Sequence, residues 1–453
     1  MSIQLGGLAT GLDTNSLISQ LLKVERKPIE RLERDRSFFK ARLAAFTDLD
    51  KRLRDLMSKA EELTTARKLV ANKATPATEE FFKVSASSTA MAGNYNIKVL
   101  SLAQREKEVS LGVASVGAKE FGAGTLSLQV GGKDPVVINI NENNNSLGGI
   151  RDAINASGAG VKAAIINDGD AANPYRLVVT ADDSGTPIEI SANLTGGSYV
   201  DDPERPFAFT QTQEGTRAHI QVDGIDIYRT SNTITEAISG VTIDLLKEHG
   251  AADAATGLQV DLDVDAVEKK IRDFTNAYNE IVSFVAKQKD ASWGRDAGMQ
   301  APLRNLQLLV STAIGGDNSL QALSQLGMQT QKDGTLKVDG TRLKDAIRND
   351  LDGVLGLFNG SVGVDGLAKK FGDYLKGVTD RANGILASRK TATDSSLRRI
   401  DQQIERQEMR LEKREKTMRA QFSAMEDLVG TLGAASSYLA QQLSMLSNFG
   451  SRR

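Results

Sequence analysis

The sequence contains no cysteine, only two histidines and a single tryptophan among its 453 residues. Without cysteine the chain has no disulfide, no thiolate nucleophile and no thiolate metal ligand. His219 and His249 fall on different expected elements, which disfavours a histidine-based triad or a two-histidine metal site. Aromatic side chains make up 5% of the chain, which disfavours a pocket with aromatic walls. These shortages predict that the protein is not an enzyme and holds no cofactor.

A large net charge of one sign is also absent, because 56 Lys and Arg residues nearly balance 58 Asp and Glu residues. The formal net charge of −2 gives no global attraction to nucleic acid or to an anionic membrane. No run of about 18 apolar residues occurs, so no membrane span is expected. The first residues, MSIQLGGLATGLD, lack the basic and apolar regions of a cleaved signal. The absence of cysteine fits a cytosolic protein, and it equally fits a protein that is exported unfolded.

Alternating aspartates in the segment DLDVD, residues 261–265, superficially resemble a calcium loop. An EF-hand needs glycine at its sixth position and glutamate at its twelfth, where this chain has Ala266 and Arg272. We therefore expect no metal here. The aspartates are instead expected on the solvent face of a strand that runs through Val264.

An apolar residue recurs every seven positions along the last part of the chain. This column consists of Leu397, Ile404, Leu411, Met418, Met425, Leu432, Leu439 and Leu446. A heptad repeat predicts an apolar stripe on a helix that packs against a partner helix. At about 1.5 Å per residue this helix would reach roughly 80 Å, well beyond the roughly 30 Å diameter of a small domain. It must therefore protrude, and something must cover its stripe.

The amino-terminal part of the chain predicts the covering partner. A first helix is expected to begin at an N-cap on Asp13 or Thr14. Pro28 is expected to interrupt it and to start a second helix that reaches roughly to Leu69. We expect the terminal helices to pair through a coiled-coil seam formed by Leu32, Phe39, Phe46, Leu53, Leu397, Ile404, Leu411, Met418 and Met425. Both charged faces lean basic, but they mix in acidic residues and lack base-stacking aromatics, so we interpret them as solvated helix faces.

Between the helices the chain carries short alternating runs such as PVVINI and YRLVVTA, separated by turn residues. This pattern predicts β-strands. Small helices are expected after Ser146 and after Thr233, each capped by a hydroxyl side chain. The dipeptide Asp333-Gly334 lies between alternating flanks and predicts a hairpin turn.

The predicted fold is an elongated, multidomain α+β chain. Its N- and C-terminal helices pair as a coiled coil or helical bundle, and β-rich modules are inserted between them. The expected divisions are terminal leg helices at 1–40 and 418–453, partly disordered when free; a helical bundle with a small β part at 41–75 and 261–417; an inner β-rich domain at 76–105 and 205–260; and an outer inserted β-rich domain at 106–204.

Several stretches follow one another in an order that resembles a known family. They are GLATGLDTNSLISQLLKVERKPIERL, NYNIKVLSLAQ, LGMQTQKDGTLKVDGTRLKDAI with LFNG, and IERQEMRLEKREKTMRAQFSAMEDLVGTLGAASSYLAQQL. They resemble the bacterial flagellar filament cap family, also called flagellar hook-associated protein 2. Residues 106–204 match this family least well, and the terminal motifs show no departure from it.

The resemblance implies a non-enzymatic, extracellular cap at the flagellum tip, exported without a cleaved signal peptide through the flagellar type III apparatus. It implies a homo-oligomeric ring, usually a pentamer, that promotes the folding and insertion of flagellin. The implied partners are further copies of the chain, flagellin, hook–filament junction proteins and a cytoplasmic export chaperone, with no nucleic acid and no membrane span.

Beyond Gly430 the C-terminal column has no obvious partner inside the chain. We therefore expect filament or chaperone contact through Gly11, Leu12, Asp13, Leu17, Leu21, Leu432, Leu439, Leu443 and Leu446. Gly430 and Gly433 weaken a helix by about 1 kcal/mol each relative to alanine. The end of the leg is thus expected to be disordered when free and helical when docked.

Two other interpretations stay open. A flagellin or a hook–filament junction protein would share the paired terminal helices, and a flagellin forms open helical fibres where a cap forms closed rings. A surface adhesin or glycan-binding protein would place its binding module in residues 76–260.

Overall fold

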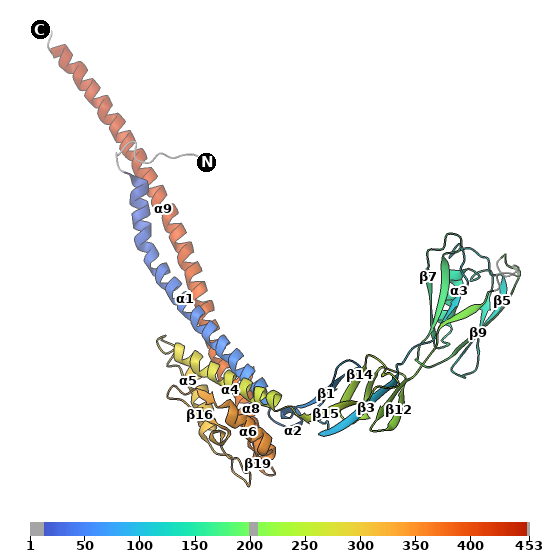
Figure 1. Cartoon of the computed structure of the whole chain (residues 1–453). Helices are drawn as coiled ribbons and strands as arrows, with labels where there is room; N and C mark the ends of the chain where they lie inside the picture. The colour runs from blue at the N-terminus through green and yellow to red at the C-terminus, as the bar shows by residue number, and fades with distance from the viewer. Residues whose placement is uncertain (1–12, 199–206, 451–453) are drawn as a thin grey trace. The chain divides into compact units, whose positions relative to one another are not determined.

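The computed structural model of the chain describes residues 13–198 and 207–450, with side chains as far as Leu443 in the last helix. The chain divides into two compact units. Unit 1 comprises residues 1–65 and 268–453, and unit 2 comprises residues 66–267. The β-rich part of the chain is therefore inserted between an N-terminal and a C-terminal helix, as the sequence predicts (Figure 1).

Unit 1 is built mainly from helices. They are α1 (Thr14–Glu61), α4 (Val264–Lys287), α5 (Ala297–Ser311), the 3₁₀ turn η1 (Leu323–Leu326), α6 (Gly340–Asn349), α7 (Leu351–Asn359), α8 (Leu367–Val378) and α9 (Ile385–Gly450). Small hairpins between them join β16 (Met328–Thr330) to β17 (Leu336–Val338) and β18 (Gly360–Ser361) to β19 (Val364–Asp365).

The helix α1 is continuous, and the expected break at Pro28 is wrong. Asp13 caps it, accepting the N–H of Ser16 on Oδ1 at 3.0 Å. Pro28 lies inside the helix, where its missing N–H removes one backbone hydrogen bond without ending the helix. The next residue, Ile29, is 1% exposed in the contact with α9, so packing holds the turn in place.

The bundle of unit 1 has an aromatic centre. Phe274 of α4 lies edge-on to Phe371 of α8, with ring centroids 5.1 Å apart. The expected hairpin at Asp333-Gly334 is confirmed between β16 and β17, with Gly334 at a φ of 87°. Tyr278 of α4 donates its hydroxyl to the carbonyl of Gly334 at 3.0 Å and thereby ties the turn to the bundle.

The inner part of unit 2 consists of antiparallel sheets. One has the order β1-β15-β3-β11-β12 and the other β13-β14-β2. The strands are β1 (Asn72–Pro76), β2 (Phe82–Ala86), β3 (Gly93–Ser101), β11 (Ala218–Val222), β12 (Ile225–Arg229), β13 (Thr233–Ile238), β14 (Val241–Leu245) and β15 (Thr256–Leu262). The chain enters on β1 and leaves on the neighbouring β15, where Asn72 pairs with Leu262. Adjacent entry and exit strands suit an inserted module.

Three local expectations in and beside this region are wrong. The segment after Thr233 is the strand β13 and not a helix, because it is rich in β-branched residues and pairs with β14. The helix that was expected to reach Leu69 ends at Glu61, and Leu69 belongs to the separate α2 (Ala66–Leu69). The strand expected through Val264 ends at Leu262. The carboxylate of Asp263 then accepts the N–H of Ala266 at 2.9 Å at the start of α4.

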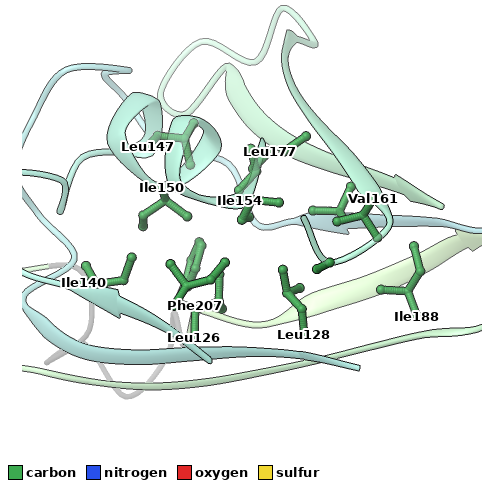
Figure 2. Packing of buried hydrophobic residues seen from close by; sticks show 14 of the residues in the cluster. Leu126, Leu128, Ile140, Leu147, Ile150, Ile154, Val161, Leu177, Ile188 and Phe207 are labelled. Atoms are coloured by element: carbon green, nitrogen blue, oxygen red, sulfur yellow. The ribbon is translucent and has the colours of Figure 1, made fainter. Parts of the chain in front are cut away.

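The outer part of unit 2 packs a helix between two further antiparallel sheets, of order β10-β4-β8-β7 and β6-β5-β9. Its elements are β4 (Lys107–Ser110), β5 (Ala123–Val130), β6 (Val136–Ile140), α3 (Leu147–Ala156), β7 (Val161–Asn167), β8 (Tyr175–Ala181), β9 (Ile188–Thr195) and β10 (Phe209–Gln213). The expected N-cap is confirmed, since Ser146 Oγ accepts the N–H of Gly149 at 3.1 Å. Figure 2 shows Leu147, Ile150 and Ile154 of α3 directed into the core beside Leu126 and Leu128 of β5.

Candidate interaction site

The terminal helices α1 and α9 lie side by side and run antiparallel (Figure 1). Polar contacts between the two helices define their register. As the residue number falls along α1, the number of the contacting residue on α9 rises. The contacts are Arg36 Nε to Asp401 Oδ1 at 2.7 Å, Arg414 Nε to Glu25 Oε1 at 3.3 Å, and Arg419 Nη1 to Asn15 Oδ1 at 3.2 Å. By this register the start of α1 lies beside the region of α9 just after Arg419.

An apolar cluster lies between the two helices. It buries Ile29 of α1 with Ile400 and Ile404 of α9, and it includes Leu32, Phe39 and Leu411 at its partly buried edge. The structure thus brings four of the predicted seam residues together, namely Leu32, Phe39, Ile404 and Leu411. Leu397 and Met418 of α9 are also buried, at 7% and 6% exposure.

Ile29 is a seam residue that the count in sevens missed. It belongs to a second column of α1, whose later members include the charged residues Arg36 and Asp50. Those charged members meet opposite charges on α9. Arg36 pairs with Asp401, and Asp50 Oδ2 pairs with Lys390 Nζ at 3.1 Å. Ion pairs between α1 and α9 therefore take the place of apolar contacts along this second column. Ile29, seven residues before Arg36, is the feature of the sequence that could have revealed the column.

The remaining predicted seam residues of α1 lie in the bundle. Phe46 and Leu53 are fully buried, and this end of α1 packs against α8. Asp296 anchors the same region to both terminal helices, since its carboxylate pairs with Arg42 of α1 at 2.9 Å and with Arg389 of α9 at 3.2 Å. Met425, the last predicted seam residue, is only partly buried.

After Met425 the apolar column of α9 continues in a different environment. Its members Leu432 and Leu439 are 60% and 61% exposed, and Leu428 and Leu443 beside them are 60% and 67% exposed. We call these four leucines the exposed stripe. With 3.6 residues per turn, these four positions fall within an arc of about 60° on one face of the helix. Figure 1 shows this part of α9 continuing past the start of α1. Within residues 13–198 and 207–450, the stripe is open to solvent.

The start of α1 adds exposed apolar side chains. Leu17 and Leu21 are 39% and 49% exposed, whereas Ile18 between them is 3% exposed. Asp13 is the exposed N-cap. The predicted contact residues Gly11 and Leu12 lie outside the described residues, as does the side chain of Leu446.

The polar candidates of unit 2 have structural roles. His249 is buried and stacks on Phe81 at 3.7 Å between ring centroids, and its Nδ1 accepts the N–H of Val99 at 3.0 Å. Burial lowers the pKa of His249 below its ordinary value. His219 pairs instead with Asp226 at 2.7 Å. Among the described residues, no group of three or more His, Asp or Glu side chains is arranged to hold a metal.

Comparison with known proteins locates the chain in a family. Family models for the N-terminus and the C-terminus of flagellar hook-associated protein 2 match residues 10–106 and 215–434, and a flagellin hook IN motif matches residues 125–183. The B-type flagellar hook-associated protein 2 of Pseudomonas aeruginosa is 33% identical over 392 residues, covering 79% of this chain and 80% of that protein. The chain belongs to the flagellar hook-associated protein 2 family.

Full-length similarity extends to other members of the flagellar hook-associated protein 2 family. The Escherichia coli K12 protein of that name is 28% identical over 477 residues, covering 99% of each chain. The crystal structure of the D1-D2-D3 domains of the flagellar cap protein FliD from Escherichia coli superposes with a TM-score of 0.62 at 28% identity. That match covers 78% of this chain and 99% of the crystallised one.

Membership of the flagellar hook-associated protein 2 family gives the chain its general role and place. The family is a structural one, that of the flagellar cap, and it is not a known enzyme family. It implies a location at the tip of the flagellum. Within the described residues, none of the helices combines the length and the apolar character that crossing a membrane requires.

Proposed function

We propose that this chain closes the tip of the flagellar filament as a homo-oligomeric ring, a pentamer in the simplest case, and promotes the folding and insertion of flagellin there. The observation that carries the proposal is the exposed stripe of α9. A row of leucines at the end of a long helix needs a partner, because burying each one stabilises a contact by about 1.5 to 3 kcal/mol. Filament subunits at the tip supply that partner.

The end of α9 is suited to repeated release and rebinding. Gly430 and Gly433 lie within it, and each lowers helix stability by about 1 kcal/mol relative to alanine. We propose that the segment beyond Gly430 unfolds when it is free and becomes helical on the filament, as each new flagellin passes. Hydrogen exchange on the purified protein tests this step, and strong protection of residues 430–450 in the free chain contradicts it.

Before docking, the same leucines need protection from aggregation. We propose that the chain is exported unfolded through the flagellar type III apparatus, with a cytoplasmic chaperone covering the exposed stripe until export. Contacts with hook–filament junction proteins precede those with flagellin in this scheme. The proposal keeps the division of the chain that the sequence predicts. The legs are residues 1–40 with 418–453, the bundle is 41–75 with 261–417, the inner module is 76–105 with 205–260, and the outer module is 106–204.

The exposed stripe is tested by a matched pair of double variants in the source bacterium. Leu432→Glu with Leu439→Glu places charge on the stripe and is expected to give short or absent filaments, with unassembled flagellin released to the medium. Ala434→Glu with Gln441→Glu adds the same charges at the same spacing on the opposite face and is expected to preserve filaments. Filament length by electron microscopy and released flagellin by immunoblot are the measurements, and equal defects in both variants contradict the proposal.

The ring is tested separately by electron microscopy of the purified full chain. Closed rings are expected, whereas open helical fibres would support the alternative of a flagellin-like filament protein. Deleting residues 106–204 tests the adhesin alternative. Filament growth should survive the loss of an adhesive module, whereas it should not survive the loss of the capping legs.

A further inference from the structure

A groove with basic walls runs between α1 and α9, midway along their contact. It has a volume of about 870 Å³. Its walls are formed by Lys27, Pro28, Glu30, Arg31, Leu32 and Arg34 of α1 and by Gln403, Arg406, Gln407 and Arg410 of α9. We call it the basic groove. Its position coincides with Pro28, where α1 lacks one backbone hydrogen bond.

Among the residues that the structure describes, the cations of the basic groove differ from their neighbours in having no ion-pair partner. Beyond one end of the groove Arg36 pairs with Asp401, and beyond the other Arg414 pairs with Glu25. Between these pairs, the structure of the described residues gives no ion pair or side-chain hydrogen bond to the basic residues of the walls, which are Lys27, Arg31, Arg34, Arg406 and Arg410. Glu30 is the single carboxylate in the lining.

This arrangement opposes the pairing of the helices. Cations of α1 face cations of α9 across one groove, and like charges brought together destabilise a contact. Among the described residues, these five exposed cations gain no ion-pair partner from folding. An anionic ligand that enters the groove would neutralise both walls at once.

The spacing of the cations indicates the shape of that ligand. Lys27, Arg31 and Arg34 are separated by four and three residues, and Arg406 and Arg410 by four, so each row follows one face of its helix. The row on α1 spans about 10 Å along the helix axis. A third helix laid in the groove presents carboxylates at the same three- and four-residue spacing. The lining contains no aromatic side chain on which a nucleic-acid base would stack.

We propose that the basic groove is the docking site for an acidic helical segment of a partner protein. The distribution of charge between the two units is a second reason to expect an acidic partner. Unit 1 carries 40 basic and 32 acidic side chains, whereas unit 2 carries 16 and 26. The excess of positive charge therefore lies in the unit that contains the groove. This site is separate from the exposed stripe of α9 and does not depend on the cap role.

The test measures binding of a fluorescently labelled oligoglutamate peptide to the full chain by anisotropy at moderate salt. Saturable binding is expected. The groove variant Arg31→Gln, Arg406→Gln, Arg410→Gln is expected to weaken it about tenfold, which corresponds to three partly exposed charge pairs. The control variant Lys40→Gln, Lys51→Gln, Arg304→Gln removes the same charge from exposed positions elsewhere in unit 1 and is expected to change affinity less than about twofold.

Glutamine has nearly the helix propensity of arginine, so both variants keep the helices, which circular dichroism verifies. The proposal is overturned if the intact chain shows no saturable binding, or if the two variants lose affinity equally, since that result means diffuse attraction. It is also overturned if labelled single-stranded DNA binds more tightly than the peptide and loses affinity in the groove variant.

Discussion

One helix, α9, carries the same apolar column through two environments. From Leu397 to Met418 the column is covered, with Ile404 at 8% exposure against α1 and Met418 at 6%. From Leu432 onward it is open, with Leu439 at 61% exposure. The residue types and spacing barely change between these parts, yet their surroundings do. A heptad repeat therefore specifies which face of a helix is apolar, and the length of the partner helix decides how much of that face is buried within the chain.

The largest expected effect comes from the covered part. Ile404→Ala removes a side chain buried against Ile29 and Leu32, and it is expected to destabilise unit 1 by about 2 to 4 kcal/mol through lost burial and the cavity left behind. Urea denaturation followed by the helical circular dichroism signal measures it. A loss below about 1 kcal/mol would mean that the seam is no better packed than the exposed stripe.

The next effect tests how well α1 covers its partner near Pro28. Pro28→Ala restores a backbone N–H inside a helix, where proline is less favourable than alanine by about 3 kcal/mol. A gain in stability of about 1 to 3 kcal/mol is expected. Ser37→Ala, at an exposed position of the same helix, serves as the control and should gain less than about 0.7 kcal/mol. Destabilisation by Pro28→Ala would show that the proline is required for the helix pairing.

A smaller effect is a dependence of stability on pH, which we expect in the inner sheets of unit 2 and not in the apolar seam. His249 Nδ1 accepts the N–H of Val99 only when it is unprotonated, and burial lowers the pKa of His249 below 6.5. The stability that it supplies is present above about pH 6.5 and is lost as the pH falls through the lower folded-state pKa. Opening free energies from hydrogen exchange should fall for β3 between pH 7.5 and 5 and stay level in the seam. His249→Gln should abolish that dependence, and its persistence would assign the effect to another group.

The smallest expected effect comes from the exposed stripe. Leu439→Ala should change the stability of the isolated chain by less than about 0.5 kcal/mol, because the side chain is 61% exposed. The same urea denaturation that reports on Ile404→Ala measures it. A loss similar to that of Ile404→Ala would break the comparison and reveal that the stripe is covered in solution.

The sequence predicts the strongly periodic parts of this fold and its simplest caps. The heptad columns place Leu32, Phe39, Ile404 and Leu411 in one cluster, because seven-residue spacing keeps a side chain on one helix face. The Asp333-Gly334 turn follows equally directly, since glycine adopts the positive φ that the turn requires.

The failures occur where tertiary packing outweighs local preference. The local sequence predicts a helix boundary at Pro28, but α1 gains more from continuous contact with α9 than it loses in one hydrogen bond. The local sequence predicts a helix after Thr233, but pairing with β14 makes this segment a strand.

The seam also sets the order in which the chain folds. Ile29 meets Ile404 across almost the whole length of the sequence, with all of unit 2 between them. Contacts of such high sequence separation form slowly, because the intervening chain must first be closed into a loop. The entropy of closing that loop grows only by about 0.6 kcal/mol for each doubling of its length, and compact folding of unit 2 shortens it. We therefore expect the two helices to meet late, after the inserted sheets have brought β1 and β15 together and drawn the ends of the loop near each other.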